Sequence, residues 1–172
     1  MHLHRRQLIH NDDIMMKAQQ GFTLIEMVVT VVIVGILASA IVPMAHISAK
    51  RSKEAELRAA LRDIRSALDA YKKAYDDGHI EKQVDASGYP RSLELLVEGV
   101  PDVRDAKKKP MRFLRRIPRD PLYPDPQARS ADTWGKRSYE SAPDAPQEGA
   151  DVYDVYSLSR DTGMNGIPYR LW

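Results

Sequence analysis

Residues 22–43 read FTLIEMVVTVVIVGILASAIVP, an almost purely apolar run. At a rise of about 1.5 Å per residue, a helix of this length matches the roughly 30 Å hydrocarbon core of a bilayer. β-branched residues dominate the run and would favour a strand in water. In lipid, however, the backbone must satisfy its own hydrogen bonds, so the segment predicts a membrane-spanning helix.

An ordinary cleaved signal peptide is the alternative interpretation of this run. The apolar stretch of such a peptide is usually about 7 to 15 residues long and ends at a small-residue cleavage site. Residues 37–40, Leu-Ala-Ser-Ala, imitate such a site. The greater length of the run and the acidic Glu26 within it favour a helix that is retained.

A second helical pattern follows Pro43. Lys, Arg, Glu and Asp alternate on most faces, and Asp76-Asp77-Gly78 ends the pattern because glycine supplies a left-handed C-terminal residue. Apolar residues recur at alternating spacings of four and three, which places them on one face of an α-helix: Leu57, Leu61, Ile64, Leu68, Tyr71 and Tyr75. The apolar run and this stripe together predict one long helix of about 50 residues.

The rest of the chain is rich in turns, since ten of its eleven prolines follow residue 76. A short helix is expected over Ser92–Val97, with Ser92 as its cap. Three strand candidates are separated by turn signals: Arg137–Ser141, Val152–Leu158 and Ile167–Leu171. We therefore expect an α+β fold, in which a small three-stranded antiparallel sheet lies on the stripe of the long helix.

Glu26 lies five residues into the apolar run, where a carboxylate is costly. Near the bilayer centre the cost is roughly 2.5 to 3.5 kcal/mol, and it is lower near an interface. One interpretation is that the side chain reaches the headgroups at the end of the helix. The other requires a positive partner, which a cut after Gly21 would create as the α-amino group of Phe22, one helical turn away. Because desolvation offsets much of the attraction, such a pair would set the register between neighbouring chains more than it would add stability.

Residues 21–26, GFTLIE, followed by an apolar run, closely resemble the signal of type IV pilin-like prepilins. The resemblance implies that a prepilin peptidase cuts between Gly21 and Phe22 and then N-methylates Phe22. It also implies that Glu26 contacts the amino terminus of a neighbouring subunit during assembly. Pro43 falls where the family often has a helix-disturbing proline, which would let the segment stretch in a filament.

The tail resembles the major pseudopilin of type II secretion. The residues that carry this resemblance are Ile117–Pro121 (IPRDP), Tyr153–Leu158 (YDVYSL), an aspartate three residues further on, and Trp172. The lack of cysteine also fits pseudopilins better than many pilins, which close a C-terminal loop with a disulfide. The resemblance implies a pilin-like fold and self-assembly into a helical filament that drives protein export. A type IV pilin or minor pilin used in adhesion, motility or DNA uptake is the alternative.

The resemblance also implies an order of segments. Residues 1–21 would be the prepilin leader, 22–43 the transmembrane and assembly helix, and 44–172 a periplasmic pilin-like globular domain that includes the second half of the long helix. The chain would then cross the bacterial inner membrane once, with its C-terminal domain in the periplasm. Its partners would be the prepilin peptidase, other pseudopilins and the inner-membrane secretion platform. A start at Met16 would give a more typical leader than the acidic one that begins at Met1.

Major pseudopilins often bind calcium in the loop after the YDVYSL-like strand, and here the carbonyl of Leu158 and the side chain of Asp161 match positions that would serve. Calcium takes six to eight oxygens, usually including more than one carboxylate. Residues 167–170, Ile-Pro-Tyr-Arg, stand where the family's second acidic ligand would be. Calcium at this loop and plain turns are therefore both open, and no other cofactor is expected.

Neither enzymatic nor nucleic-acid chemistry is favoured. After Gly21 only His46 and His79 could act as histidine bases, and no catalytic or phosphate-binding motif accompanies them. The near balance of 26 Lys and Arg against 24 Asp and Glu argues against a nucleic-acid footprint. Residues 107–119 are locally basic, but Phe113 is the only aromatic among them, so a salt bridge to an acidic neighbour in a filament is an equal explanation.

Overall fold

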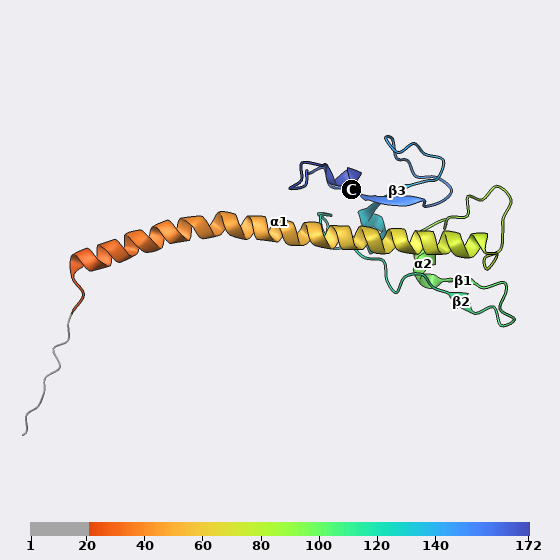
Figure 1. The fold of residues 1–172 in the computed structure, drawn as a ribbon, viewed down its shortest axis with the longest axis horizontal. Helices are drawn as coiled ribbons and strands as arrows, with labels where there is room; N and C mark the ends of the chain where they lie inside the picture. The colour runs from red at the N-terminus through yellow and green to blue at the C-terminus, as the bar shows by residue number, and fades with distance from the viewer. Residues whose placement is uncertain (1–20) are drawn as a thin grey trace, which may run out of the picture. The chain divides into compact units, whose positions relative to one another are not determined.

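The structure is a computed structural model that describes residues 21–172, except for the side chains of residues 40–43 and 45. The chain divides into two compact units, Met1–Met44 and Ala45–Trp172. The predicted leader therefore lies almost wholly outside the described residues. The expected long helix is confirmed as α1, Leu24–Asp76, which is 53 residues long (Figure 1).

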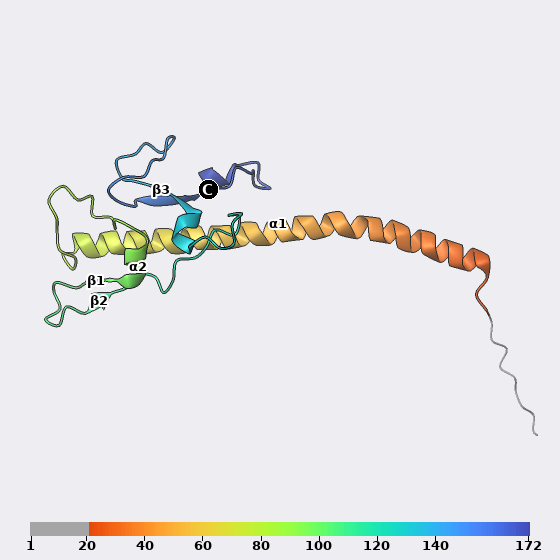
Figure 2. The same cartoon turned by 180° about the vertical axis from the view of Figure 1, so that it is seen from behind.

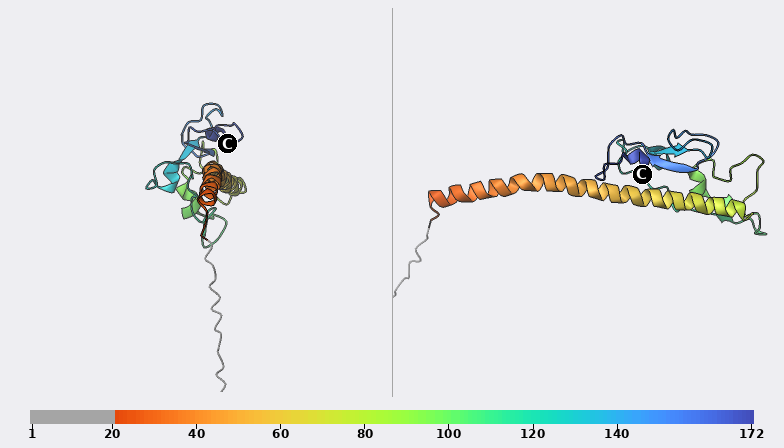
Figure 3. Two further views of the ribbon diagram at one scale, coloured as in Figure 1. Left: turned by 90° about the vertical axis from the view of Figure 1, so that its left-hand side faces the viewer. Right: turned by 45° about the horizontal axis from the view of Figure 1, so that its top comes forward.

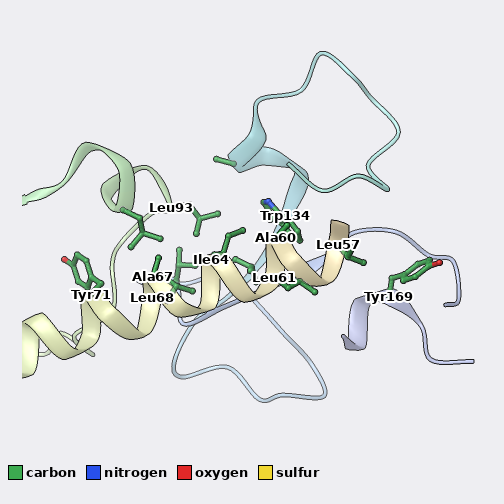
Figure 4. Close-up of a cluster of buried hydrophobic side chains, with 14 of the residues drawn as sticks. Leu57, Ala60, Leu61, Ile64, Ala67, Leu68, Tyr71, Leu93, Trp134 and Tyr169 are labelled. Carbon is green, nitrogen blue, oxygen red and sulfur yellow. The ribbon is translucent and has the colours of Figure 1, made fainter. Parts of the chain in front are cut away.

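The predicted stripe of α1 forms the core of the second unit. Leu57, Leu61, Ile64 and Leu68 are all buried, and Tyr71 is buried at the end of the row. Figure 4 shows these side chains along the helix, together with residues that later segments contribute to the same cluster, among them Leu93, Trp134 and Tyr169. Each large apolar side chain buried in this way stabilises the fold by about 1.5 to 3 kcal/mol, so the stripe supplies much of the driving force for folding.

The predicted stop of α1 is also confirmed. Gly78 has a φ of +79°, its N–H donates to the carbonyl of Tyr75, and the N–H of His79 donates to the carbonyl of Ala74. This pair of bonds is the Schellman arrangement, which satisfies carbonyls that the helix end would leave free.

The expected short helix is present as α2, Glu94–Glu98, but its start was wrong. Leu93 occupies the cap position and no side chain caps the helix, so Ser92 does not have the predicted role. The physical reason is burial, because Leu93 and Leu96 are both fully buried. The carbonyl of Leu96 also accepts the N–H groups of Phe113 and Leu114, each at 2.8 Å.

The prediction of one three-stranded sheet was wrong, because the described residues form two separate antiparallel pairs. β1 (Val100–Pro101) pairs with β2 (Pro110–Met111), and β3 (Trp134–Arg137) pairs with β4 (Asp154–Ser157). The two pairs lie on different sides of the second half of α1 (Figures 1 and 2). The turned views in Figure 3 show the β3–β4 pair running alongside the same part of the helix.

Only the middle strand candidate was placed correctly, since β4 lies inside Val152–Leu158. The first candidate begins where β3 ends, because the N–H of Ser138 turns away to the carbonyl of Gln147. The third candidate, Ile167–Leu171, holds the 3₁₀ turn η2, Tyr169–Leu171, instead of a strand. Pro168 has no N–H to donate to a ladder, and the chain makes one isolated bridge between Thr162 and Pro168 before it turns.

The two tail motifs, which lie far apart in sequence, meet at a buried carboxylate. Asp120 and Ser157 are both 0% exposed, and the hydroxyl of Ser157 donates to Asp120 at 2.6 Å. The other oxygen of Asp120 accepts the N–H of Leu122 at 2.8 Å, while its own N–H donates to the hydroxyl of Thr133. This network ties the proline-rich loop to β4 and so fixes the start of the C-terminal loop.

Candidate assembly segment and C-terminal loop

The first turn of α1 is stabilised by a capping box. The N–H of Glu26 donates to the hydroxyl of Thr23 at 3.3 Å, and the N–H of Thr23 donates back to the carboxylate of Glu26 at 3.5 Å. Such reciprocal bonds satisfy two donors that a helix start would otherwise leave free. In the separate chain, Glu26 therefore has a partner in its own backbone and points toward the residues that precede the helix. The pattern T-x-x-E before an apolar run was readable in the sequence, but the prediction did not use it.

The apolar run is exposed on all sides in the described chain. Phe22 is 78% exposed, and the large apolar side chains that follow it are exposed as well: Leu24, Ile25, Met27, Val28, Val29, Val31, Val32, Ile33, Val34, Ile36 and Leu37. A helix that is apolar all round belongs in a membrane or in a protein core. The run therefore requires partners outside this chain.

The polar side chains in this run are satisfied by the helix itself. The hydroxyl of Thr30 donates to the carbonyl of Glu26 at 2.7 Å, and that of Ser39 donates to the carbonyl of Ile36 at 2.7 Å. In an apolar environment, hydroxyls without such acceptors would carry a large desolvation cost. The segment thus presents few unmet polar groups to its surroundings.

Among the residues that the structure describes, no helix meets both the length and the hydropathy of a membrane span. The predicted span at 22–43 includes residues 40–43, whose side chains are outside the described part, and it stays a prediction. Pro43 lies within the bounds of α1, and its effect on the helix likewise stays a prediction.

The C-terminal loop, defined here as residues 158–168, contains the two positions considered for calcium. Asp161 is its only carboxylate, and both Leu158 and Asp161 are exposed. The loop closes on itself through main-chain bonds: the N–H of Gly163 donates to the carbonyl of Ile167, and the N–H of Gly166 donates to the carbonyl of Gly163. These are the turns that the second reading of the sequence anticipated.

The donors of this loop do not fit a calcium ion. No group of three or more acidic, histidine or cysteine side chains in the described part of the chain could hold a metal. In addition, the carbonyl of Thr162, next to Asp161, accepts the ammonium group of Lys50 at 2.8 Å. A positive charge already bound to a loop carbonyl opposes a divalent cation at the same place.

His79 and the aromatic residue of the basic segment, Phe113, both make structural contacts. His79 lies 3.0 Å from Asp102, and its carbonyl accepts the N–H of Val103, so it joins the end of α1 to the β1–β2 hairpin. Phe113 packs against Tyr71 in the core, with ring centroids 5.3 Å apart. The only aromatic of the basic segment is therefore not presented as a platform for a base.

The comparisons with known proteins agree with the tail and the N-terminal signal. A family model described as the prokaryotic N-terminal methylation motif matches residues 16–42. A type II secretion system core protein G of Klebsiella pneumoniae is 31% identical over 150 residues, which cover 84% of this chain and 99% of that protein. The chain belongs to the type II secretion system core protein G family. Core protein G of Pseudomonas aeruginosa is 31% identical over 156 residues, covering 87% of this chain and 89% of the relative. Core protein G of Vibrio cholerae is 36% identical over 112 residues, covering 62% and 67%. No solved structure matches the chain.

Membership in the core protein G family confirms the predicted branch. The chain is a major pseudopilin of type II secretion that carries a prepilin N-methylation motif, and its family is structural and not enzymatic. The motif implies anchoring in the inner membrane, and the family implies partners within the secretion system.

Sequence reasoning missed two buried carboxylates of this core protein G. Asp120 holds the tail motifs together, and Glu54, only 3% exposed, contacts the C-terminal loop. Glu54 had a readable signal: it stands three residues before Leu57 and therefore extends the apolar stripe of α1 by one position. A carboxylate on a packed helix face predicts a polar partner from another segment.

Proposed function

We propose that this chain is made as a precursor that crosses the bacterial inner membrane once through residues 22–43, with the unit from residue 45 onward in the periplasm. Prepilin peptidase cuts between Gly21 and Phe22 and N-methylates Phe22. The mature chain then polymerises with other copies into the periplasmic pseudopilus that drives protein export. The single observation that carries the proposal is the carboxylate of Glu26, which accepts the N–H of Thr23, the second residue after the cleavage position, at the start of a helix that is otherwise apolar all round.

The capping box explains why cleavage would switch Glu26 from a local to an intermolecular role. In the uncut chain, its carboxylate accepts the neutral N–H of Thr23 at 3.5 Å, a long and weak bond. Capping interactions of this kind contribute about 0.5 to 2 kcal/mol. The bond to Thr23 is already charge-assisted on the carboxylate side, but cleavage supplies a charged amino group on Phe22, which adds the attraction between two opposite unit charges. A neighbour's amine can therefore compete successfully for Glu26 once the leader is gone.

A neighbour's amine can reach Glu26 while the capping box stays in place. One oxygen of the exposed carboxylate accepts the Thr23 N–H, and a carboxylate has further acceptor capacity for the amine of a second subunit. Two unit charges 4 Å apart attract by about 4 kcal/mol at an effective dielectric of 20, before desolvation is subtracted. That net gain is small enough to set register without locking an incorrect contact.

The rest of the chain supports the same role. The apolar run needs partners on every side, and its hydroxyls are satisfied by its own backbone. The unit from residue 45 onward has its own core and would cover the outside of the filament. Prepilin peptidase, other pseudopilins and the inner-membrane secretion platform are the partners that this role requires. Every relative reported above is a secretion protein, so the pilin alternative has no observation in its favour.

The test compares two substitutions that both break the capping box. Glu26→Ala removes the carboxylate, whereas Thr23→Ala removes the hydroxyl and leaves the carboxylate in place. We expect both proteins to insert into the membrane and to lose the leader, but only Glu26→Ala to abolish filaments sheared from cells that overproduce the secretion system. Mass spectrometry of the mature protein should show methylated Phe22 as the first residue in each case.

Three results would contradict the proposal. Normal filament assembly by Glu26→Ala would show that the carboxylate has no intermolecular role. A mature wild-type protein that begins elsewhere than Phe22 would remove the amine on which the argument depends. Equal loss of filaments in both variants would mean that helix capping, and not the charge pair, is what assembly requires.

A further inference from the structure

We propose that the C-terminal loop of this pseudopilin is closed against α1 by protein side chains alone, and that its folding needs no divalent cation. The inference uses the family membership established above, because the calcium expectation came from that family. It does not depend on filament assembly. Four side chains of α1 carry it, and they are called the clamp below: Lys50, Glu54, Arg58 and Arg65.

Lys50 occupies the loop where a metal would be expected to neutralise carbonyl oxygens. Its ammonium group donates to the carbonyl of Thr162 at 2.8 Å. Thr162 directly follows Asp161, the one carboxylate of the loop. An ammonium group bound to a carbonyl beside a carboxylate supplies the positive charge that a calcium ion would otherwise bring, although with one charge instead of two.

Glu54 holds the far side of the loop. Its carboxylate is almost wholly buried, and one of its oxygens accepts the N–H of Met164 at 2.7 Å and the hydroxyl of Tyr169 at 2.9 Å. Burial raises the pKa of the Glu54 carboxyl, but these two hydrogen bonds and the charges of Arg58 and Lys50 outweigh it and lower the pKa overall. Glu54 is therefore charged at neutral pH and accepts bonds from the loop instead of binding a metal.

Arg58 and Trp172 close the clamp over the end of the chain. The guanidinium of Arg58 lies 4.2 Å from the centre of the Trp172 ring and 3.6 Å from the carboxylate of Glu54. The indole N–H of Trp172 donates to the carbonyl of Ile167 at 3.2 Å. Gly163 permits this packing, because a Cβ there would lie 2.4 Å from the Trp172 ring.

Arg65 holds both the strand that leads into the loop, β4, and the last residue of the sequence, Trp172. Its guanidinium donates to the carboxylate of Asp154 at 2.8 Å, to the carbonyl of Val155 at 3.2 Å and to the carbonyl of Trp172 at 2.7 Å. The segment on each side of the loop is thus tied to α1, and Figure 4 shows Tyr169 next to Leu57 at one end of the core.

The clamp and a calcium ion are alternatives for the same task. Calcium would need several further oxygens around Leu158 and Asp161, yet Glu54, the α1 carboxylate that contacts the loop, is committed to two donors and paired with Arg58. Two cationic side chains, Lys50 and Arg58, already face this region. Their charges oppose a divalent ion and replace its bridging role between loop and helix.

The test measures thermal unfolding of the full chain in detergent micelles, with either 1 mM calcium chloride or 1 mM EGTA, followed by tryptophan fluorescence. If the calcium concentration were about one hundred times the Kd of a calcium site, binding would raise Tm by roughly 5 °C or more. We expect no difference between the two conditions for the wild type, and a lower Tm for Glu54→Gln in both. Glu56→Gln, an exposed carboxylate on the same helix, is the matched control and should leave Tm unchanged.

Lys50→Met keeps the test decisive should Glu54→Gln fail to fold. Lys50 is exposed, so its replacement should unfold nothing but should increase amide hydrogen exchange across residues 160–168 several-fold, with or without calcium. Unchanged exchange in Lys50→Met would overturn the clamp. A rise in the wild-type Tm with calcium that Asp161→Asn abolishes would equally overturn it, because it would demonstrate a metal site. Neither readout involves filaments, so this inference can fail while the proposed assembly role stands.

Discussion

Removing the buried carboxylate of Asp120 should destabilise the globular unit strongly. In Asp120→Ala, the hydroxyl of Ser157 loses its 2.6 Å acceptor and the N–H of Leu122 loses its 2.8 Å acceptor. A buried donor left without a partner costs about 1 to 3 kcal/mol. Because the Leu122 N–H is only partly buried, the two donors together should cost roughly 2 to 5 kcal/mol. A typical domain is stable by only about 5 to 15 kcal/mol, so the variant should lose a large share of its stability.

A double-mutant cycle would show whether the Asp120–Ser157 bond carries this loss. Ser157→Ala removes the donor, so adding it to Asp120→Ala should cost less than it does in the wild type. We expect a coupling energy of about 1 kcal/mol or more between the two positions, measured by urea unfolding of all four proteins. Lys107→Ala and Lys109→Ala, in the exposed loop of the β1–β2 hairpin, serve as a pair of surface controls with no expected effect.

The reasoning would be refuted by additive effects. If Asp120→Ala and Ser157→Ala together cost the sum of the single changes to within about 0.5 kcal/mol, the two side chains would not act through one bond. A loss below about 1 kcal/mol for Asp120→Ala alone would show that water satisfies the released donors, and that the carboxylate is not what joins the tail motifs.

Four further predictions concern the clamp and the core. The pKa of Glu54 is lowered from its ordinary value of 4.5 in the folded chain, so the stability that this carboxylate contributes is complete above that value and is lost as pH falls below it. In urea unfolding between pH 6 and pH 3, the free energy of unfolding should therefore decline less for Glu54→Gln than for the wild type. Parallel curves for the two proteins would count against this role of Glu54. Burial and the Glu54 charge raise the pKa of Tyr169 to about 12. The stability that this neutral phenol contributes is therefore present below pH 10 and is lost between about pH 10 and 12. Tyr169→Phe should flatten this decline in the free energy of unfolding. Gly163→Ala places a Cβ 2.4 Å from the Trp172 ring, so it should lower Tm and shift tryptophan emission. Gly166→Ala meets open space but has a φ of +78°, so it should lower Tm without shifting the emission. Identical emission spectra for the two variants would contradict the packing of Trp172 on Gly163. Ile64→Ala, at the centre of the core, should cost about 2 to 5 kcal/mol in urea unfolding, and a cost under 1 kcal/mol would mean that the stripe is not packed as described.

Much of α1 could be predicted from the sequence because its signals are local. The spacing of Leu57, Leu61 and Ile64 depends only on 3.6 residues per turn, and the stop at Gly78 depends on the conformation of one residue. The sheet was harder to predict. The strand β4 was found, but β3 begins three residues before its candidate, and the last candidate became a 3₁₀ turn.

The candidate sites divide in the same way. The motif at residues 21–26 is contiguous, and the family comparisons agree with it. The calcium reading of Leu158 and Asp161 counted only the oxygens of one loop. The calcium call itself stays a prediction, and the side chain that we propose in place of a metal, Lys50, lies 112 residues before Thr162 in sequence, so no local pattern could reveal it.

By itself, the sequence determined the long helix, its apolar stripe, its end and the prepilin signal, because each follows from neighbours within one or two helical turns. Only the tertiary structure decided the two separate strand pairs, the meeting of Asp120 with Ser157 and the clamp on the C-terminal loop. These depend on which distant segments share a burial surface, and that choice follows from the packing of the whole unit and not from any one stretch of residues.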